Sequence, residues 1–330
     1  MLTAEVEIFA LSTDDISVTI DPGRGADILS LIDRHSGLDV LFHTPWREHA
    51  DAIRAGARPT SFDAKAGWLE QYRGGWQTLC PTGGEARSLH GAPLGFHGEA
   101  SVAAWVVDSE TNNTASLHLS LFSVPIRIDR VVTLDGSTVR VVDTLKNASN
   151  AGLEIDYSQH PAFGGAFLDG PCRIETGARR FTSDADTTSI ANPGSDYAWP
   201  FALSPDGETV DLRQISAPGA SRELFGWLHD FTEPWASITN DALGLTARIE
   251  WDDAHLPYAW VWQELNASKT FPWFERARAV AIEPASMQTS GPDRRSVLRL
   301  APWAETTIAL SITLERATFT HPTISEIRSE

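Results

Sequence analysis

The amino-acid sequence predicts an all-β fold, a large antiparallel β-sandwich with few and short helices. Short segments of alternating or β-branched residues recur from one end of the chain to the other. Glycine, proline, asparagine and aspartate lie between these segments, where they favour turns. Long amphipathic helices are almost absent, so the chain lacks the helical crossovers that a parallel sheet needs. These three observations together indicate antiparallel strands.

Strands are predicted wherever apolar and polar residues alternate or β-branched residues cluster. In chain order they are Ile16–Ile20, Ser101–Val107, Ala115–Phe122, Ile126–Leu134, Leu153–Tyr157, Leu245–Trp251, Tyr258–Gln263, Ala277–Ile282, Val297–Leu300 and Thr306–Leu314. One turn is specified more closely, because Asp135-Gly136 separates two alternating segments in VVTLDGSTVRVVDTL. Both central residues of a tight hairpin turn must tolerate positive φ, and Asp-Gly does so.

Two segments depart from the strand pattern. Arg47–Ala55 (REHADAIRA) follows Pro45 and is predicted as a short peripheral helix with a thin apolar face. Thr182–Asp211 is rich in Ser, Asp, Pro and Gly and is predicted as a long loop, of the kind that often borders a binding site. No internal repeat or linker divides the chain, so residues 1–330 are predicted to form one domain.

The composition excludes several classes of partner. The formal net charge of -18 opposes binding to nucleic acid or to an anionic membrane surface, since both need clustered Lys and Arg. No signal peptide and no apolar run of about 20 residues is visible, so we expect a cytoplasmic protein. Cys80 and Cys172 are expected to be reduced, because a chain with a large core does not need a disulfide.

Three regions place titratable or aromatic side chains beside glycine or proline. They are YRGGWQTLCPTGG (72–84), GFHGE (95–99) with QHPAFGG (159–165), and AIEPASMQT (281–289). Taken singly, His97, His160 and Glu283 each have an ordinary structural explanation, as a loop histidine, a strand-end histidine and a solvated carboxylate. Their combination is what indicates a functional site.

In combination the three regions resemble the aldose 1-epimerase (mutarotase) family and its galactose mutarotase-like superfamily. The matching residues are His97-Gly98, His160-Pro161 within HPAFG, and Glu283-Pro284, in the family's order and at family-like separations. The resemblance spans nearly the whole chain and implies a β-supersandwich in which these residues line one sugar pocket. VVTLDGSTVRVVDTLKNAS is similar to the superfamily's hairpin, which ends here at Asn147.

The resemblance also implies a set of substrate-binding residues. The segment around Arg73 and Trp76 is similar to the rim of the family's pocket, and Tyr258–Gln263 is similar to the strand that contacts the sugar. An Asp-His pair of galactose-type members is replaced here by His229-Asp230, in reverse order. The substrate-binding residues expected on this basis are Arg73, Trp76, Asp230, Trp262 and Gln263.

The chemistry of anomer exchange suits these residue types. Opening a pyranose removes the proton of the anomeric hydroxyl and protonates the ring oxygen, and each positioned proton transfer is worth roughly 10²- to 10⁴-fold. By resemblance, Glu283 is the base, His160 is the acid, and His97 and Arg73 hold the oxygens on which charge develops. This reaction needs no cofactor and no metal, so the only partner expected is a small sugar, bound by a monomer or homodimer.

Three alternatives stay open at this point. An epimerase for an anionic sugar would use converging cations, for which Arg73, Arg87, Arg276 and Arg278 are available. A non-catalytic carbohydrate-binding protein on the same fold would have little reason to keep both acid and base. A glycoside hydrolase would need a second carboxylate opposite Glu283, either Glu99 or Asp156, and would leave the two histidines unexplained.

Overall fold

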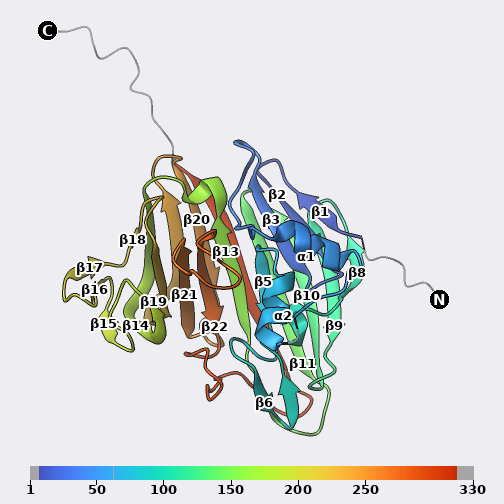
Figure 1. Ribbon diagram of the computed structural model, residues 1–330. Coiled ribbons are helices and arrows are strands. Elements are labelled where there is room, and N and C mark those ends of the chain that lie inside the picture. Colours follow the sequence, from blue (N-terminus) through green and yellow to red (C-terminus); the bar gives the residue numbers. More distant parts are fainter. Residues whose placement is uncertain (1–6, 62, 318–330) are drawn as a thin grey trace, which may run out of the picture.

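The computed structural model describes residues 7–61 and 63–317, and antiparallel strands make up most of its regular secondary structure. Eighteen strands of the described chain join into one continuous, strongly curved sheet system. Figure 1 shows β14, β19, β20, β21 and β22 on one side, β1, β2, β8, β9, β10 and β11 on the other, and β5 and β13 between them. The predicted β-supersandwich is therefore confirmed.

The strands of the first half of the chain are β1 (Phe9–Ser12), β2 (Ile16–Asp21), β3 (Asp27–Asp33), β4 (Leu38–Asp39), β5 (Trp76–Leu79), β6 (Arg87–Leu89), β7 (Ala92–Leu94), β8 (Val106–Glu110), β9 (Thr114–Ser120), β10 (Ile126–Asp135), β11 (Thr138–Asn147), β12 (Leu153–Glu154) and β13 (Ser158–Gly164). Those of the second half are β14 (Cys172–Thr188), β15 (Asp196–Ala198), β16 (Phe201–Leu203), β17 (Thr209–Asp211), β18 (Gln214–Ile215), β19 (Arg222–Asn240), β20 (Leu245–Trp251), β21 (Tyr258–Leu265), β22 (Arg278–Ala285), β23 (Arg299–Leu300) and β24 (Glu305–Arg316).

The predicted hairpin forms, but its two turn residues are Gly136 and Ser137, one residue later than the predicted Asp135-Gly136 turn. Asp135 pairs with Thr138 across the turn, and Gly136 has φ 53°. Both strands alternate buried and exposed residues along their length, so one face of the hairpin enters the core. The predicted strands at β2, β9, β20, β21 and β24 are also present, within a few residues at their ends.

Four further sequence predictions need correction. Strand β8 begins only at Val106, because Glu99–Ser101 forms a 3-10 turn in place of the start of the predicted strand 101–107. Strands β12 and β23 are two-residue pairs, shorter than predicted. The segment 182–211 is not a plain loop, because β14 continues to Thr188 and β15, β16 and β17 follow. Its polar residues lie on strands whose exposed positions face solvent.

The structure contains two α-helices in its described part, α1 (Arg47–Arg54) and α2 (Ala64–Gln71). Helix α1 was predicted, and it buries Ala50 and Ile53. Helix α2 was not predicted; Asp63 caps it by accepting hydrogen bonds from the Lys65 and Ala66 N–H groups. Both helices pack in front of the sheet, beside β3 and β5 (Figure 1). No helix of the described chain is long and apolar enough to cross a membrane.

Most buried apolar residues form one continuous core between the sheet layers, and Cys80 and Cys172 lie in it as free thiols. A second, aromatic cluster lies apart from this core, under α2. It consists of Phe42, Trp68, Tyr72, Ala162, Ala277, Ala279 and Ala281, with Trp46, Leu69, Phe96, Trp262 and Trp273 packed against it. Small alanines on β13 and β22 leave room there for large rings, and this cluster marks the candidate site.

Candidate functional site

A row of polar side chains crosses the sheet where five strands lie side by side. His160 on β13 pairs with Gln77 on β5, and Glu283 on β22 pairs with Trp260 on β21. The pairs Ser158 with Ala285 and Ala162 with Ala281 place His160 opposite Glu283. Ile28 pairs with Trp76, which puts the preceding residue, Asp27, beside Gln77. Residues paired across strands point to the same face, so Asp27, Gln77, His160, Glu283 and Trp260 form one row.

His160 and Glu283 form a buried pair at the centre of this row. His160 Nε2 lies 3.5 Å from Glu283 Oε1, and both side chains are less than a tenth exposed. Burial lowers the pKa of His160 to about 4 and raises the pKa of Glu283 well above its ordinary value. Both shifts favour the uncharged forms, a protonated carboxyl group on Glu283 and a neutral imidazole ring on His160.

His97 reaches the same place from a turn before the 3-10 helix Glu99–Ser101. Its own N–H donates to the Gly84 carbonyl (3.1 Å), and the Gly84 N–H donates to His97 Nδ1 (3.1 Å). Because Nδ1 accepts, the ring proton is on Nε2 in the neutral form. Burial and the neighbouring His160 lower the pKa of His97, and the two rings lie 5.7 Å apart. His97 therefore presents an N–H donor beside the His160–Glu283 pair.

Several polar atoms along the row have no hydrogen-bond partner. They are Asp27 Oδ1, Gln77 Oε1, His160 Nδ1 and Glu283 Oε2, together with the hydroxyl of Tyr72, whose pKa is raised by burial and by Glu283 and Asp27 nearby. More than nine in ten buried polar groups in proteins are paired, so five unpaired atoms at one place are unusual. A polyhydroxylated molecule could satisfy them. Asp27, Tyr72 and Gln77 were not predicted from the sequence.

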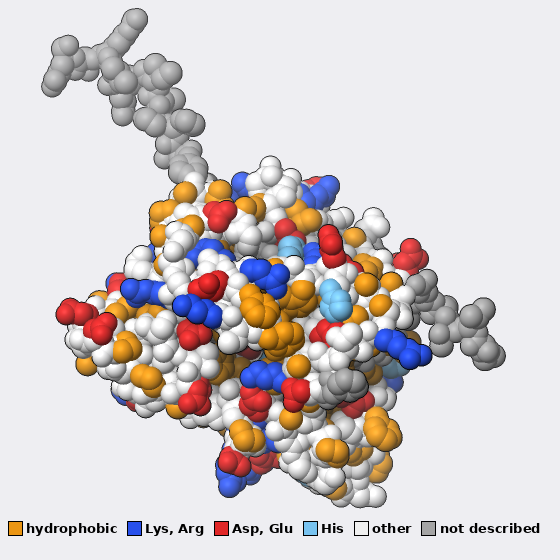
Figure 2. Space-filling view, in the orientation of Figure 1, with side chains coloured by type: hydrophobic (Ala, Val, Ile, Leu, Met, Phe, Trp, Pro, Cys, Tyr) orange, Lys and Arg blue, Asp and Glu red, His pale blue; other side chains and the backbone are white. Residues whose placement is uncertain are grey.

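Aromatic rings enclose His160 and continue toward the surface. The Trp68, Tyr72 and Trp262 rings lie 6.4, 5.9 and 6.3 Å from His160, and Trp273 lies 5.2 Å from both Trp262 and Trp46. Trp46 lines a cavity of about 160 Å³ together with His49, Thr60, Ser61, Glu70, Phe271, Pro272, Phe274 and Arg276. Figure 2 shows hydrophobic side chains gathered near the middle of this face, between basic side chains and a histidine. Such rings suit the apolar CH faces of a sugar.

The five residues expected to bind substrate lie in different places. Trp262 is in the aromatic wall beside His160. Trp76 lies in the main core and donates from Nε1 to Gln159 (2.6 Å). Gln263 pairs with Val280, on the face opposite Glu283. Asp230 is half-exposed and pairs with Arg179, so the structure does not bring Trp76, Gln263 or Asp230 to the row.

Arg73 is buried but is engaged away from the row. Its Nη2 donates to Asp21 (2.6 Å), which also accepts from Arg54. Arg73 acts on the row through its charge, because it lowers the pKa of Asp27. Burial is the larger effect and raises that pKa to about 7. Asp27 is therefore partly protonated at neutral pH, and a hydrogen bond from the Gln77 amide to its carboxylate acts in the opposite direction to burial, lowering that pKa.

Glu99 and Asp156, the two candidates for the second carboxylate of a glycoside hydrolase, are held by other contacts away from Glu283. Asp156 is fully buried between Arg87 (2.6 Å) and Arg294 (2.8 Å). Glu99 accepts hydrogen bonds from the Phe122 and Ser123 N–H groups and from the Ser123 hydroxyl. Neither is a second carboxylate opposite Glu283. Among residues 7–61 and 63–317, no group of three His, Cys, Asp or Glu side chains is arranged to hold a metal ion.

The His160–Glu283 pair predicts an unusual dependence of stability on pH. The ordinary pKa values of Glu and His are about 4.5 and 6.5. Between them the unfolded chain holds one titratable proton on this pair, on the histidine, and the folded chain also holds one, on the carboxyl group. The pair therefore adds no pH dependence to the free energy of unfolding in this range. In Glu283→Gln only His160 titrates; its folded pKa is depressed, so stability is lost as pH falls from 6.5 toward 4, by about 3 kcal/mol in total. In His160→Gln only Glu283 titrates; its folded pKa is raised, so stability is lost as pH rises above 4.5.

Urea unfolding at half-unit pH intervals measures these slopes. The free energy of unfolding of each variant is compared with that of the unsubstituted protein at the same pH, which cancels the titration of all other groups. Opposite slopes for the two variants between pH 4.5 and 6.5 are expected. Parallel curves for all three proteins would show that burial does not shift these two pKa values.

Comparison with known proteins places the chain in a family. A family model described as a domain of unknown function (DUF4432) matches residues 4–314. No curated protein matches the chain. Among solved structures, the Slr1438 protein from Synechocystis sp. PCC 6803 is 16% identical, with a TM-score of 0.68 and coverage of 94% of this chain and 96% of that one.

Two further solved structures, both of galactose mutarotase-like proteins, are similar to this chain. A galactose mutarotase related enzyme from Lactobacillus acidophilus is 15% identical, with a TM-score of 0.65 and coverage of 95% of this chain and 99% of that one. A galactose mutarotase-like protein from Lactobacillus casei is 15% identical, with a TM-score of 0.63 and coverage of 94% and 100%. The chain therefore belongs to the DUF4432 family and has the fold of the galactose mutarotase-like proteins.

Proposed function

We propose that this chain is an aldose 1-epimerase, which interconverts the α and β anomers of a free sugar. The observation that supports this most is the His160–Glu283 pair, an imidazole and a carboxyl group 3.5 Å apart, both with an unpaired atom. An acid and a base held at one place are what ring opening requires. The pair lies among aromatic rings that suit a sugar, on a fold shared with a galactose mutarotase related enzyme.

In the proposed reaction, a substrate hydroxyl donates to Glu283 and lowers its pKa, so the shared proton moves to His160. Glu283 then takes the proton of the anomeric hydroxyl while His160 Nε2 gives its proton to the ring oxygen. The C1–O5 bond breaks and the C1 carbonyl forms. After rotation about C1–C2, the carbonyl presents its other face, and the two proton transfers run in reverse to close the ring.

The remaining polar groups have supporting parts in this proposal. His97 donates from Nε2 to a sugar oxygen, since its Nδ1 is occupied by the Gly84 N–H group. Tyr72, Gln77 and Asp27 hold sugar hydroxyls through their unpaired atoms. Arg73 and Arg87 already pair with Asp21 and Asp156. Arg276 and Arg278 donate to backbone carbonyls, so a neutral sugar fits this site better than an anionic one.

Anomer exchange in freshly dissolved sugars tests the proposal. The equilibration of α-anomers of a panel of neutral aldoses is followed by NMR, with and without micromolar protein. At least one sugar should equilibrate faster in proportion to the protein concentration. If no sugar equilibrates faster while one perturbs the Trp262 or His160 signals on binding, the chain is a carbohydrate-binding protein and the enzyme proposal fails.

A further inference from the structure

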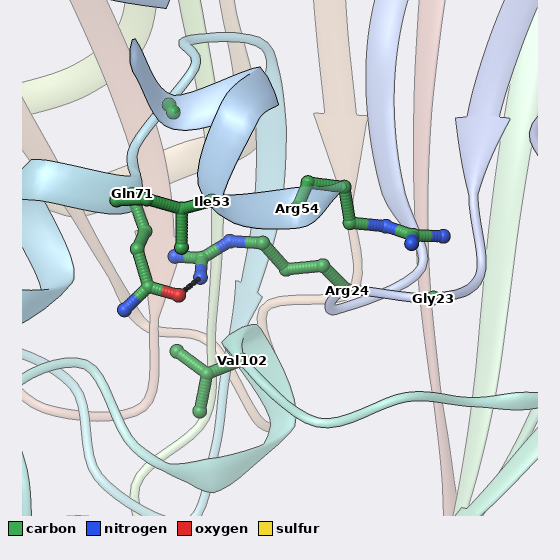
Figure 3. A pocket seen from close by; sticks show the side chains of 7 residues that line it. Gly23, Arg24, Ile53, Arg54, Gln71 and Val102 are labelled. Carbon is green, nitrogen blue, oxygen red and sulfur yellow. Dashed lines mark hydrogen bonds between the residues drawn. The ribbon is translucent and has the colours of Figure 1, made fainter. Parts of the chain in front are cut away.

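A separate cavity of about 200 Å³ opens between the two helices and the turn that joins β2 to β3. It is lined by Gly23, Arg24, Ala50, Ile53, Arg54, Gln71 and Val102. Figure 3 shows the guanidinium group of Arg24 pointing at Gln71, with Ile53 and Val102 to either side of it. Helix α2 separates this cavity from the candidate site, since Gln71 lines the cavity while Trp68 belongs to the aromatic cluster.

Arg24 differs from the other buried arginines of the described chain. Arg73, Arg130 and Arg294 each pair with a buried carboxylate, at 2.6, 2.7 and 2.8 Å. Arg24 is only 6% exposed, yet its one hydrogen-bonded partner is the neutral amide of Gln71, at 2.7 Å. Its Nε has no partner. A buried charge is normally paired with an opposite charge, because leaving it unpaired is strongly unfavourable.

Nearby charges do not replace the missing partner. Asp21 and Asp27 attract Arg24 and Arg73 repels it, but no described carboxylate lies within 4.0 Å of its guanidinium. Asp21 is already occupied by Arg54 and Arg73. The guanidinium therefore lies at the wall of a cavity open to small molecules, with unused donors.

We propose that this cavity binds a small oxyanion, a carboxylate or a phosphate group, which pairs with Arg24. Gln71 Nε2 donates to the Gly67 carbonyl (3.0 Å), and it can give a second hydrogen bond to the anion if the side chain turns away from that carbonyl. Ala50, Ile53 and Val102 give the cavity an apolar wall, so it also has room for a short hydrocarbon chain beside the charged group. The protein as a whole carries a net charge of -18, which disfavours non-specific anion binding elsewhere.

Thermal unfolding of the full chain in different sodium salts at equal ionic strength tests this inference, and it does not depend on the proposed sugar chemistry. Phosphate, acetate and butyrate are compared with chloride. At least one of the three should raise the unfolding temperature in a saturable manner. Tighter binding of butyrate than acetate identifies an organic carboxylate as the ligand, and tighter binding of phosphate identifies a phosphate.

Three variants show whether Arg24 binds the anion. Arg24→Gln should weaken the binding by about 10- to 100-fold, the value of one charge-assisted hydrogen bond. Gln71→Glu supplies the missing carboxylate from the protein, so it should unfold at a higher temperature and lose the response to anions. Arg295→Gln removes the same charge from an exposed position and should respond as the unsubstituted protein does.

The outcomes separate clearly. Anion stabilisation that is equal in the unsubstituted protein, Arg24→Gln and Gln71→Glu would place the anion elsewhere and overturn the inference. So would the lack of any stabilisation relative to chloride. If Arg24→Gln does not fold, the response of Gln71→Glu to anions tests the inference alone, because this variant keeps Arg24 and changes only its partner.

Discussion

Replacing Glu283 with glutamine should lower the rate of anomer exchange by about 10²- to 10⁴-fold, the value of one positioned proton transfer. Glutamine keeps the size of the side chain but cannot accept the proton of the anomeric hydroxyl. The rate is measured by saturation transfer between the anomer signals of the best sugar found in the panel. Because binding contacts remain, the loss should appear in kcat more than in KM.

Matched variants make this result specific. His160→Gln should cause a loss of similar size, and the double variant should lose little more than either single variant, since the two groups act as a unit. Glu250→Gln makes the same change on an exposed position of β20 and should leave the rate unchanged. An active unsubstituted enzyme with a fully active Glu283→Gln variant would assign the base to another residue.

Removing the carboxylate of Asp156 should destabilise the protein by about 3–5 kcal/mol. Asp156 is fully buried, pairs with Arg87 and Arg294, and accepts a hydrogen bond from the Gly83 N–H group. Asp156→Ala leaves two arginines without their charged partner in the interior. The free energy of unfolding in urea measures the loss, and Asp253→Asn, which removes an exposed charge, should cost less than about 0.5 kcal/mol.

The same variant should also disturb the site. Gly83 adjoins Gly84, whose N–H group fixes the tautomer of His97, so loosening this turn should change the His97 ring signals in NMR. A loss of stability below about 1 kcal/mol would mean that water replaces the carboxylate at both arginines. Unchanged His97 signals would show that the turn is held by other contacts.

Local sequence patterns predicted much of the fold. The hairpin of β10 and β11 and strands β20 and β24 follow from alternation and turn chemistry, which are local properties. Helix α2 (AKAGWLEQ) has no apolar stripe, so nothing in its sequence distinguishes it from a loop. It becomes a helix because the Asp63 cap and the burial of Trp68 stabilise it in the folded chain.

The candidate site was predictable only in part. His97, His160 and Glu283 were found by resemblance, and the structure brings the three together. Adjacent residues of a strand point to opposite faces of the sheet, and the sequence did not predict which of the two faces the site. Trp76 was expected in the site, but the next residue, Gln77, lies there. Asp27 could not be found at all, because its place depends on β3 lying beside β5, far away in the sequence.

The polar row has a consequence for how the protein matures. Its members come from β3, β5, β13, β21 and β22, so strands that hold positions 27 and 283 must join one sheet before the row is complete. Pairings between such distant segments form slowly, because a long loop must close before any contact stabilises it. Chain collapse and local hairpins should therefore precede the completion of the row. Under the proposed function, recovery of anomer exchange during refolding would report completion of the whole sheet, and no fragment that lacks either end of the row would show it.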